Sequence, residues 1–240
     1  MTEVAVILGV SAIDGLGGAI ARRFAAGGLH TVVAGRTVER LELVVKDIQD
    51  KGGSASYCTT DATQAEAVHD LIADAASHGT IKAVIFNVGN NQPLAFADLG
   101  AEKFETFWRT CTLAGFHTAK AALPVLEQNS GSLLFTGASA SMRGRPGFAH
   151  FSAAKAGLRN MAQAIAKEYG PKGVHVGHVV VDGVINGEIV QNFLGDYLEG
   201  LGEDGSLQPD AIAEAYWYLH TQPRNCWTFE LDVRPFKENW

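Results

Sequence analysis

Short runs of valine, isoleucine and other apolar residues alternate along this chain with longer stretches in which apolar residues recur at helical spacing. Several of the runs are continuous rather than alternating, as in TVVAG at 31–35, which is typical of strands buried on both faces of a sheet. The runs predict strands near 3–10, 30–35, 54–59, 81–87, 131–137, 173–181 and 226–233.

The stretches between these runs define the remaining elements. They predict helices near 15–28, 37–51, 64–78, 102–128, 149–170 and 208–221. Strands that alternate with helices in this way favour a parallel sheet, because each crossover places a helix on one face. No Pro- or Ser-rich linker interrupts the pattern, and 240 residues can bury one sizeable core. We therefore expect an α/β fold: a single domain, residues 1–240, with one doubly wound parallel sheet of about seven strands and helices on both faces.

The longest irregular segment is 182–207, in which apolar residues recur at roughly helical spacing. These residues are Ile189, Val190, Phe193, Leu194 and Tyr197. A segment after a late strand is a common place for a binding loop. It is either a lid over a pocket or a simple cover for the edge of the core.

Composition narrows the class of protein. The chain is 47% hydrophobic and 19% charged, and its net charge of -7 comes from 19 basic and 26 acidic residues with no basic run. We therefore expect no nucleic-acid partner. No stretch approaches the ~20 apolar residues that cross a bilayer, and the N-terminus lacks a signal-peptide pattern. We expect a soluble cytoplasmic protein with no membrane partner, reduced cysteines and no metal site.

A glycine-rich stretch, GVSAIDGLGG at 9–18, connects the first predicted strand to the first predicted helix. Glycine lets the backbone approach a pyrophosphate closely, and a helix N-terminus supplies free N–H groups and partial positive charge. Glycines alone also occur in plain tight turns, so the position between strand and helix carries the prediction. We expect a dinucleotide to contact Gly9, Ser11, Gly15, Leu16 and Gly17.

The end of the second predicted strand, VVAGR, is where this kind of site reads the adenosine ribose. Gly35 and Arg36 leave room and a cation for a 2'-phosphate where an acid would favour the ribose hydroxyls, so we expect NADP(H) rather than NAD(H). Asp14 in the glycine turn counts against this preference, and Arg36 as an ordinary surface residue is the alternative. Asp61 either accepts from the adenine amino group or caps the next helix.

With these features, the chain resembles the short-chain dehydrogenase/reductase family, single-domain Rossmann enzymes that use a nicotinamide cofactor, over nearly its whole length. The first family motif, G-x-x-x-G-x-G, is matched with two extra residues in the turn. The family's N-A-G element corresponds to Asn87, Val88 and Gly89, and its P-G element to Asp182 and Gly183. The resemblance implies cofactor contacts from Asn87, Gly89, Lys155, Gly183 and Ile185.

The resemblance also implies a catalytic group of asparagine, serine, tyrosine and lysine. Counting along the chain places Cys111, Ala138 and Phe151 at the first three positions, and only Lys155, whose role is to bind ribose, is kept. The catalytic candidates are therefore Lys155, Ser139 and Phe151, with Ser139 as the nearest substitute for the missing serine. His150 is interpreted as an exposed histidine at the start of a helix, with a role in proton transfer as the alternative.

The aromatic C-terminal segment suggests self-association. Phe236 and Trp240 follow the last predicted strand and would be costly to leave in water. Because the family commonly forms dimers or tetramers, we expect the tail 234–240 to pack on another copy in a homodimer or homotetramer. Glu230, Asp232 and Arg234 are expected to form ion pairs at that interface.

Taken together, these features predict an NADP-dependent oxidoreductase of the short-chain type with an atypical site. It would transfer hydride to or from a small carbonyl, alcohol or activated alkene substrate. The alternative is a nucleotide-binding protein without turnover, acting as a sensor or a non-catalytic subunit.

Overall fold

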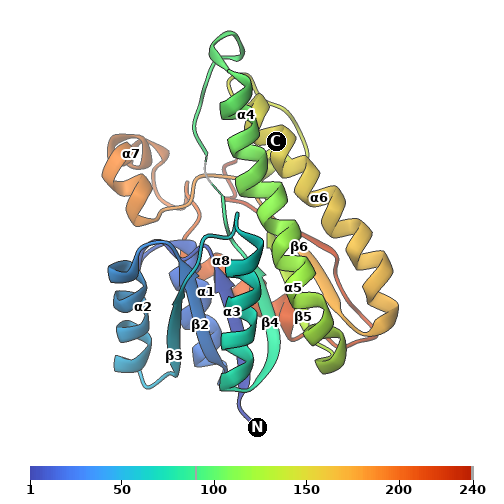
Figure 1. The fold of residues 1–240 in the computed structure, drawn as a ribbon. Helices are drawn as coiled ribbons and strands as arrows, with labels where there is room; N and C mark the ends of the chain where they lie inside the picture. The colour runs from blue at the N-terminus through green and yellow to red at the C-terminus, as the bar shows by residue number, and fades with distance from the viewer. Residues whose placement is uncertain (90, 239–240) are drawn as a thin grey trace.

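A seven-stranded parallel sheet in the order β3-β2-β1-β4-β5-β6-β7 forms the centre of the computed structural model, which describes residues 1–89 and 91–238 (Figure 1). The strands are β1 (Glu3–Leu8), β2 (His30–Gly35), β3 (Ala55–Thr59), β4 (Thr80–Phe86), β5 (Ser132–Thr136), β6 (His175–Val181) and β7 (Glu230–Val233). The predicted α/β fold with a single Rossmann-type doubly wound sheet is confirmed. The strand order reverses between β1 and β4, and the carboxyl ends of the strands at such a point form the usual ligand crevice.

Helices cover both faces of the sheet. They are α1 (Leu16–Ala26), α2 (Val38–Asp50), α3 (Ala65–His78), α4 (Ala101–Trp108), α5 (Ala114–Asn129), α6 (Ala149–Tyr169), α7 (Glu188–Leu201) and α8 (Pro209–His220). Apolar side chains of α1, α2 and α8 pack in one core cluster, and those of α3, α5 and α6 pack in another on the opposite face. A π-helical turn, Arg109–Leu113, joins α4 to α5, so the helix expected over 102–128 is present with one wide turn inside it.

The last strand is shorter than predicted, because β7 begins at Glu230 rather than at residue 226. The main-chain N–H of Thr228 donates to the side chain of Gln222 at 2.7 Å and is therefore not available to the sheet ladder. The ring of Trp227 stacks on His175 with the centroids 4.9 Å apart. The segment before β7 therefore lies against the start of β6 without being part of the strand.

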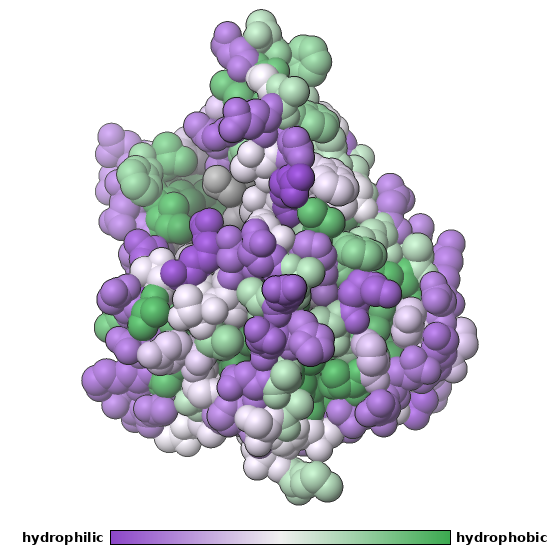
Figure 2. Space-filling view, viewed as in Figure 1, coloured by the Kyte–Doolittle hydropathy of each residue, from purple (hydrophilic) through white to green (hydrophobic). Residues whose placement is uncertain are grey.

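The segment 182–207 contains α7, and none of the residues of that helix is buried. Phe193 is 81% exposed, and Figure 2 shows apolar surface over α7. The segment is closed at its base, where the N–H of Leu207 donates to Val184 and the N–H of Asn186 donates to Leu207, each at 2.8 Å. The roughly helical spacing of apolar residues in this segment thus corresponds to a helix, and its apolar side chains are largely exposed.

The charged residues around β7 find partners within the chain, and their expected place at an intersubunit interface stays a prediction. Glu230 pairs with Arg159 at 2.5 Å, and Arg234 pairs with Asp232 and lies 3.8 Å from Asp182. Parallel pairing of β7 with β6 places these side chains beside α6 and the end of β6, where opposite charges already lie. Phe236 is 78% exposed, and Trp240 lies outside the described residues.

No helix in the described part of the chain is both long and apolar enough to span a membrane.

Candidate cofactor and catalytic site

The glycine turn after β1 brings the start of α1 against the end of β4. Gly9 has a φ of +90°, and a Cβ at this position would lie 2.6 Å from the main-chain carbonyl of Asn87. A Cβ at Gly17 would lie 2.9 Å from the carbonyl oxygen of Gly9. These close approaches require glycine, and they bring the backbone of the turn together with β4 at the switch point of the sheet.

The N-terminus of α1 is free to bind an anion. Its N-cap residue, Gly15, contributes no side-chain hydrogen bond, and its first turn contains no acidic residue. Leu16 is buried, whereas Ser11 and Asp14 are exposed at the rim of the turn. Free N–H groups at a helix N-terminus suit a pyrophosphate, so this part of the site fits the expected dinucleotide.

Two arginines flank the end of β2. Arg36 is exposed and makes no hydrogen bond or ion pair with another residue that the structure describes. Arg40, in the first turns of α2, donates from Nη1 to the main-chain carbonyl of Ser11 at 2.6 Å. Sequence reasoning missed Arg40, although its position four residues after Arg36 places it one helical turn further along. The positive charge therefore lies directly beside the glycine turn.

Asp61 has the geometry of a turn cap. Its Oδ1 accepts hydrogen bonds from the main-chain N–H of Thr63 at 2.9 Å and from the Thr63 hydroxyl at 2.8 Å. The side chain thus orders the loop between β3 and α3. Contact with adenine stays a prediction.

A hydrogen-bonded network joins the ends of β1, β4 and β5 to α6. Asn87 donates from Nδ2 to the carbonyl of Gly9 at 3.2 Å, and its Oδ1 accepts from the Thr136 hydroxyl at 2.9 Å. The ammonium of Lys155 donates to the Thr136 carbonyl at 2.8 Å and lies 3.2 Å from where a Cβ would stand on Gly89. Burial lowers the pKa of Lys155, against a weaker opposing effect of Cys111. The network brings Asn87, Gly89 and Lys155 together, and their contact with a cofactor stays a prediction.

The three positions expected to differ from the catalytic group lie in one apolar cluster. Cys111, in the π-helical turn, and Phe151, in the first turn of α6, are buried together with Phe107, and Ala138 packs against them. The ring centroid of Phe151 is 5.9 Å from the Nζ of Lys155. Carbon and sulfur atoms therefore border the lysine on this side.

The hydroxyl of Ser139 has no hydrogen-bond partner in the described part of the chain. Ser139 is half-buried in a short 3-10 turn, Ser139–Ser141, directly after Ala138. The neighbouring Ser141 is buried, and its Oγ accepts from the N–H of Ala138 at 3.1 Å. Of these two serines, Ser139 is the one whose hydroxyl is available to a ligand.

His150 is buried at 1% exposure, so the prediction of an exposed histidine is wrong. Its Nε2 lies 3.0 Å from the carbonyl oxygen of Gln92, and its ring meets Phe107 edge-on with a centroid distance of 4.2 Å. The first turn of α6 faces α4 and the chain before it rather than solvent, which explains the burial.

Asp182 and Gly183 follow β6, and Asp182 lies beside two arginines, Arg143 and Arg234, that sequence reasoning did not connect with it. Asp182 is 2% exposed, and both of its carboxylate oxygens accept from Nη2 of Arg143 at 3.1 and 3.0 Å. Gly183 has a φ of +148°, and a Cβ there would lie 2.7 Å from Pro235. Ile185 pairs with Leu207 at the base of the α7 segment. Asp182 directly follows the run of valines that ends β6, so its burial could have been expected, and a buried carboxylate needs a cation such as Arg143.

Comparisons with known proteins agree with this geometry. A sequence model described as short chain dehydrogenase matches residues 3–196. An uncharacterized oxidoreductase of Listeria monocytogenes is 28% identical over 247 residues, covering 99% of this chain and 98% of the relative. A crystal structure of a short-chain dehydrogenase from Rhodopseudomonas palustris has a TM-score of 0.83 and 33% identity over 98% of this chain and 99% of its own.

A third likeness concerns a cofactor complex. The structure of an alcohol dehydrogenase from Thermococcus sibiricus complexed with 5-hydroxy-NADP has a TM-score of 0.84 and 26% identity over 100% of this chain and 99% of its own. The fold and the glycine turn define a Rossmann-type oxidoreductase. The chain belongs to the short-chain dehydrogenase family, which confirms the resemblance seen in the sequence.

Proposed function

We propose that this protein binds NADP(H) at the carboxyl ends of β1, β2 and β4 and transfers hydride to or from a small carbonyl, alcohol or activated alkene substrate. The observation that carries the proposal is the Asn87–Thr136–Lys155 network, because it holds a buried ammonium at the crevice, and this ammonium pairs with no carboxylate among the residues that the structure describes. A buried cation is costly, so its retention beside a glycine turn favours a ligand that uses it.

The preference for NADP(H) rests on Arg36 and Arg40. Both follow β2 closely, where the 2'-phosphate of NADP(H) would be read, and the strand ends in Gly35 and is followed by Arg36 rather than by an acid. The bound 5-hydroxy-NADP of the Thermococcus sibiricus alcohol dehydrogenase supports the same choice by analogy. Free N–H groups at α1 and the fixed point charge of Lys155 serve the pyrophosphate and the ribose.

In the proposed reaction, the residues of the site bind the cofactor, exclude water and transfer a proton. When bound, the nicotinamide supplies or accepts the hydride. Lys155 holds ribose hydroxyls, while Phe151 and Cys111 exclude water from one side of the reacting atoms. The Ser139 hydroxyl, or a water beside it, passes a proton to or from the substrate oxygen. A positioned acid is worth roughly 10² to 10⁴ in rate, so turnover of ordinary carbonyl compounds should be slow.

The second candidate function is nucleotide binding without turnover. The observation in its favour is the apolar cluster of Cys111, Ala138 and Phe151, which places no acid beside Lys155. On this alternative, the protein is a sensor or a non-catalytic subunit that keeps only the cofactor site.

Three further expectations remain part of the proposal. Residues 1–240 act as one domain in which 182–207 closes over the substrate, because α7 carries exposed apolar side chains beside the base at Ile185. The tail 234–240 contacts another copy in a homodimer or homotetramer, and exposed Phe236 supports this. The protein acts in the cytoplasm.

The experiment titrates the purified protein with NADPH and NADH by fluorescence and then screens carbonyl and enone compounds for NADPH oxidation. Saturable binding that is tighter for NADPH, followed by turnover of at least one compound, supports the first function. Binding without oxidation above background across the panel supports the second. No saturable binding of either nucleotide contradicts both.

A further inference from the structure

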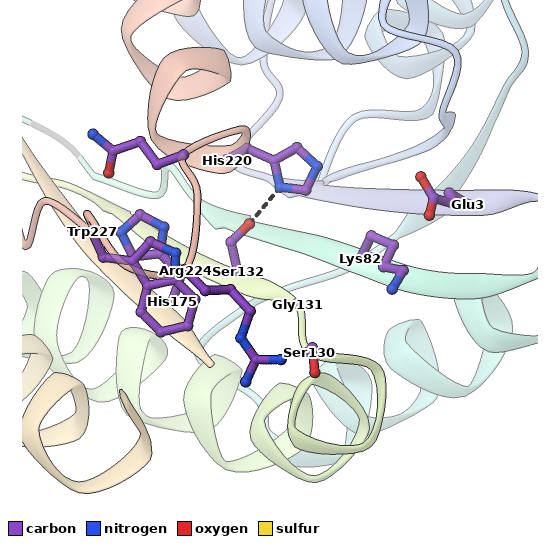
Figure 3. Close-up of a pocket in the computed structure, with 10 residues that line it drawn as sticks. Glu3, Lys82, Ser130, Gly131, Ser132, His175, His220, Arg224 and Trp227 are labelled. Carbon is purple, nitrogen blue, oxygen red and sulfur yellow. Dashed lines mark hydrogen bonds between the residues drawn. The ribbon is translucent and has the colours of Figure 1, made fainter. Parts of the chain in front are cut away.

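A separate cavity of about 220 Å³ lies at the amino ends of β4, β5 and β6, at the opposite end of the sheet from the glycine turn (Figure 3). Its walls come from these strand ends, from Ser130 after α5, and from the chain that follows α8. Rossmann-type cofactors bind at the carboxyl ends of the strands, so the proposed cofactor site leaves this cavity unused.

The cavity contains a guanidinium group with no protein acceptor. Arg224 is exposed and forms no hydrogen bond or ion pair with any residue that the structure describes. Its Nη2 lies 2.9 Å from where a Cβ would stand on Gly173, and Ser130 Oγ lies 3.5 Å from the same point. Figure 3 shows the guanidinium beside Ser130. Gly173, with a φ of +92°, therefore leaves the space that the guanidinium occupies.

Lys82 provides a second cation. Its ammonium donates to the carbonyl of Asn129 at 2.7 Å, which fixes it at the cavity wall and leaves two of its three hydrogens for other acceptors. Glu3 is the one acidic residue in the lining and is exposed. The walls thus carry more positive than negative charge.

A neutral donor pair completes the polar side of the cavity. Ser132 Oγ and His220 Nδ1 are 2.8 Å apart. Burial, with weaker effects of His175 and Lys82, lowers the pKa of His220 to about 4, so the ring is neutral at pH 7. If the hydroxyl donates to Nδ1, the imidazole keeps its Nε2–H. If Nδ1–H donates, the hydroxyl keeps its own hydrogen. In either case the pair keeps one hydrogen that is not used between its two members.

From this arrangement we infer that the cavity binds phosphate, either as the free ion or as the terminal group of a small phosphomonoester. Phosphate oxygens take N–H donors from guanidinium and ammonium groups, and hydroxyls and imidazole complete the shell. The lining offers four kinds of donor, from Arg224, Lys82, Ser130 and the Ser132–His220 pair. At about 220 Å³ the cavity holds a phosphate with a few attached atoms and is too small for a second dinucleotide.

The test is calorimetric titration with inorganic phosphate against sodium chloride of equal ionic strength. The wild-type protein should bind phosphate saturably. Arg224→Gln should weaken binding by about tenfold or more, because a charge-assisted hydrogen bond is lost. The matched control is Arg109→Gln, which removes an exposed arginine paired with Glu105 at 2.8 Å and should leave phosphate binding unchanged.

Glycerol phosphate, titrated in parallel, distinguishes the two sources of the group. Tighter binding than inorganic phosphate assigns the cavity to a phosphomonoester, and equal or weaker binding assigns it to the free ion. NADPH binding by Arg224→Gln should match the wild-type protein, so this result is independent of the proposed cofactor site. The inference would be overturned if sodium chloride gave the same titration as phosphate, or if Arg224→Gln bound phosphate with wild-type affinity.

Discussion

Lys155 and Thr136 share a hydrogen bond of 2.8 Å inside the protein, from the ammonium of one to the main-chain carbonyl of the other. The lysine is only 4% exposed, and burial lowers its pKa. A carbonyl compensates a buried positive charge incompletely, so this ammonium adds little net stability to the fold. We therefore expect the ammonium to serve ligand binding at the crevice that it faces.

The first prediction follows from this relationship. Lys155→Met should leave the free energy of unfolding within about 1 kcal/mol of wild type, because the cost of burying a charge disappears together with one hydrogen bond. NADPH affinity should fall by about tenfold or more. Urea denaturation and fluorescence titration measure the two effects. Lys120→Met, at an exposed position of α5, should change neither; a large loss of stability in Lys155→Met would assign the lysine a structural role.

The second prediction compares two glycines with almost the same backbone conformation. Gly9 and Gly28 have φ values of +90° and +94°, but only at Gly9 would a Cβ meet another atom, the carbonyl of Asn87 at 2.6 Å. Gly28→Ala should cost about 1 to 2 kcal/mol of stability, the usual penalty for a left-handed residue. Gly9→Ala should cost clearly more and also weaken NADPH binding. Equal losses in the two variants would show that the contact with Asn87 is unimportant.

Arg36 allows a third prediction about cofactor choice. Arg36→Leu should reduce NADPH affinity by about tenfold and leave NADH affinity unchanged, because only NADPH carries the phosphate that a cation would contact. Arg40→Leu should have a smaller effect, since Arg40 Nη1 already donates to the Ser11 carbonyl at 2.6 Å. Fluorescence titrations with NADPH and with NADH measure the affinity of each variant relative to the wild-type protein. A proportional loss for both nucleotides would instead place Arg36 outside the phosphate site.

The sequence predicted the sheet because its central strands are local apolar runs, and such a run is typical of a parallel strand buried on both faces. The glycine turn was visible because its glycines cluster within ten residues of the sequence, between a strand and a helix, whereas the contact of Gly9 with Asn87 appears only in the fold. The partnership of Arg143 with Asp182 was not visible, because 39 residues separate them and only the fold brings the loop after β5 to the end of β6. The burial of His150 depends in the same way on how α6 packs against α4.

A fourth prediction concerns pH. His178 is fully buried, its Nδ1 lies 3.1 Å from Oε2 of Glu230, and burial lowers its pKa to about 4 against the raising effect of Glu230, with Lys155 and Arg159 adding smaller lowering effects. The folded protein therefore keeps this histidine neutral, while the unfolded chain takes up a proton near pH 6.5. Stability contributed by the neutral ring is complete above pH 6.5 and is lost as the pH falls toward 4.

At about 1.4 kcal/mol per pKa unit, the shifted pKa of His178 should lower the free energy of unfolding by up to roughly 3 kcal/mol over that pH range. His220, with a pKa also lowered to about 4, should contribute a similar loss. His178→Gln should therefore make the fall in unfolding free energy between pH 6.5 and 4 less steep than in the wild-type protein. His69→Gln, at an exposed position, should leave the profile unchanged. Urea denaturation at a series of pH values measures the slopes, and a profile of wild-type steepness in His178→Gln would contradict the assignment.

The last prediction restores the two missing hydroxyl groups beside Lys155. Phe151 is 7% exposed with its ring centroid 5.9 Å from Nζ, and Ala138 packs in the same cluster. Phe151→Tyr with Ala138→Ser should raise NADPH-dependent carbonyl reduction by roughly 10² or more, because a positioned acid and a donor for the substrate oxygen are gained.

The matched control for this pair is Phe148→Tyr. Phe148 packs against the same cluster, so the substitution adds a phenol to the same surroundings without placing it at position 151. Initial rates with a panel of ketones, measured by NADPH absorbance, compare the variants. An equal increase in Phe148→Tyr would show that any added phenol suffices. If the double variant binds NADPH and reduces ketones no faster than wild type, the slow chemistry has a cause other than the apolar replacements at positions 138 and 151.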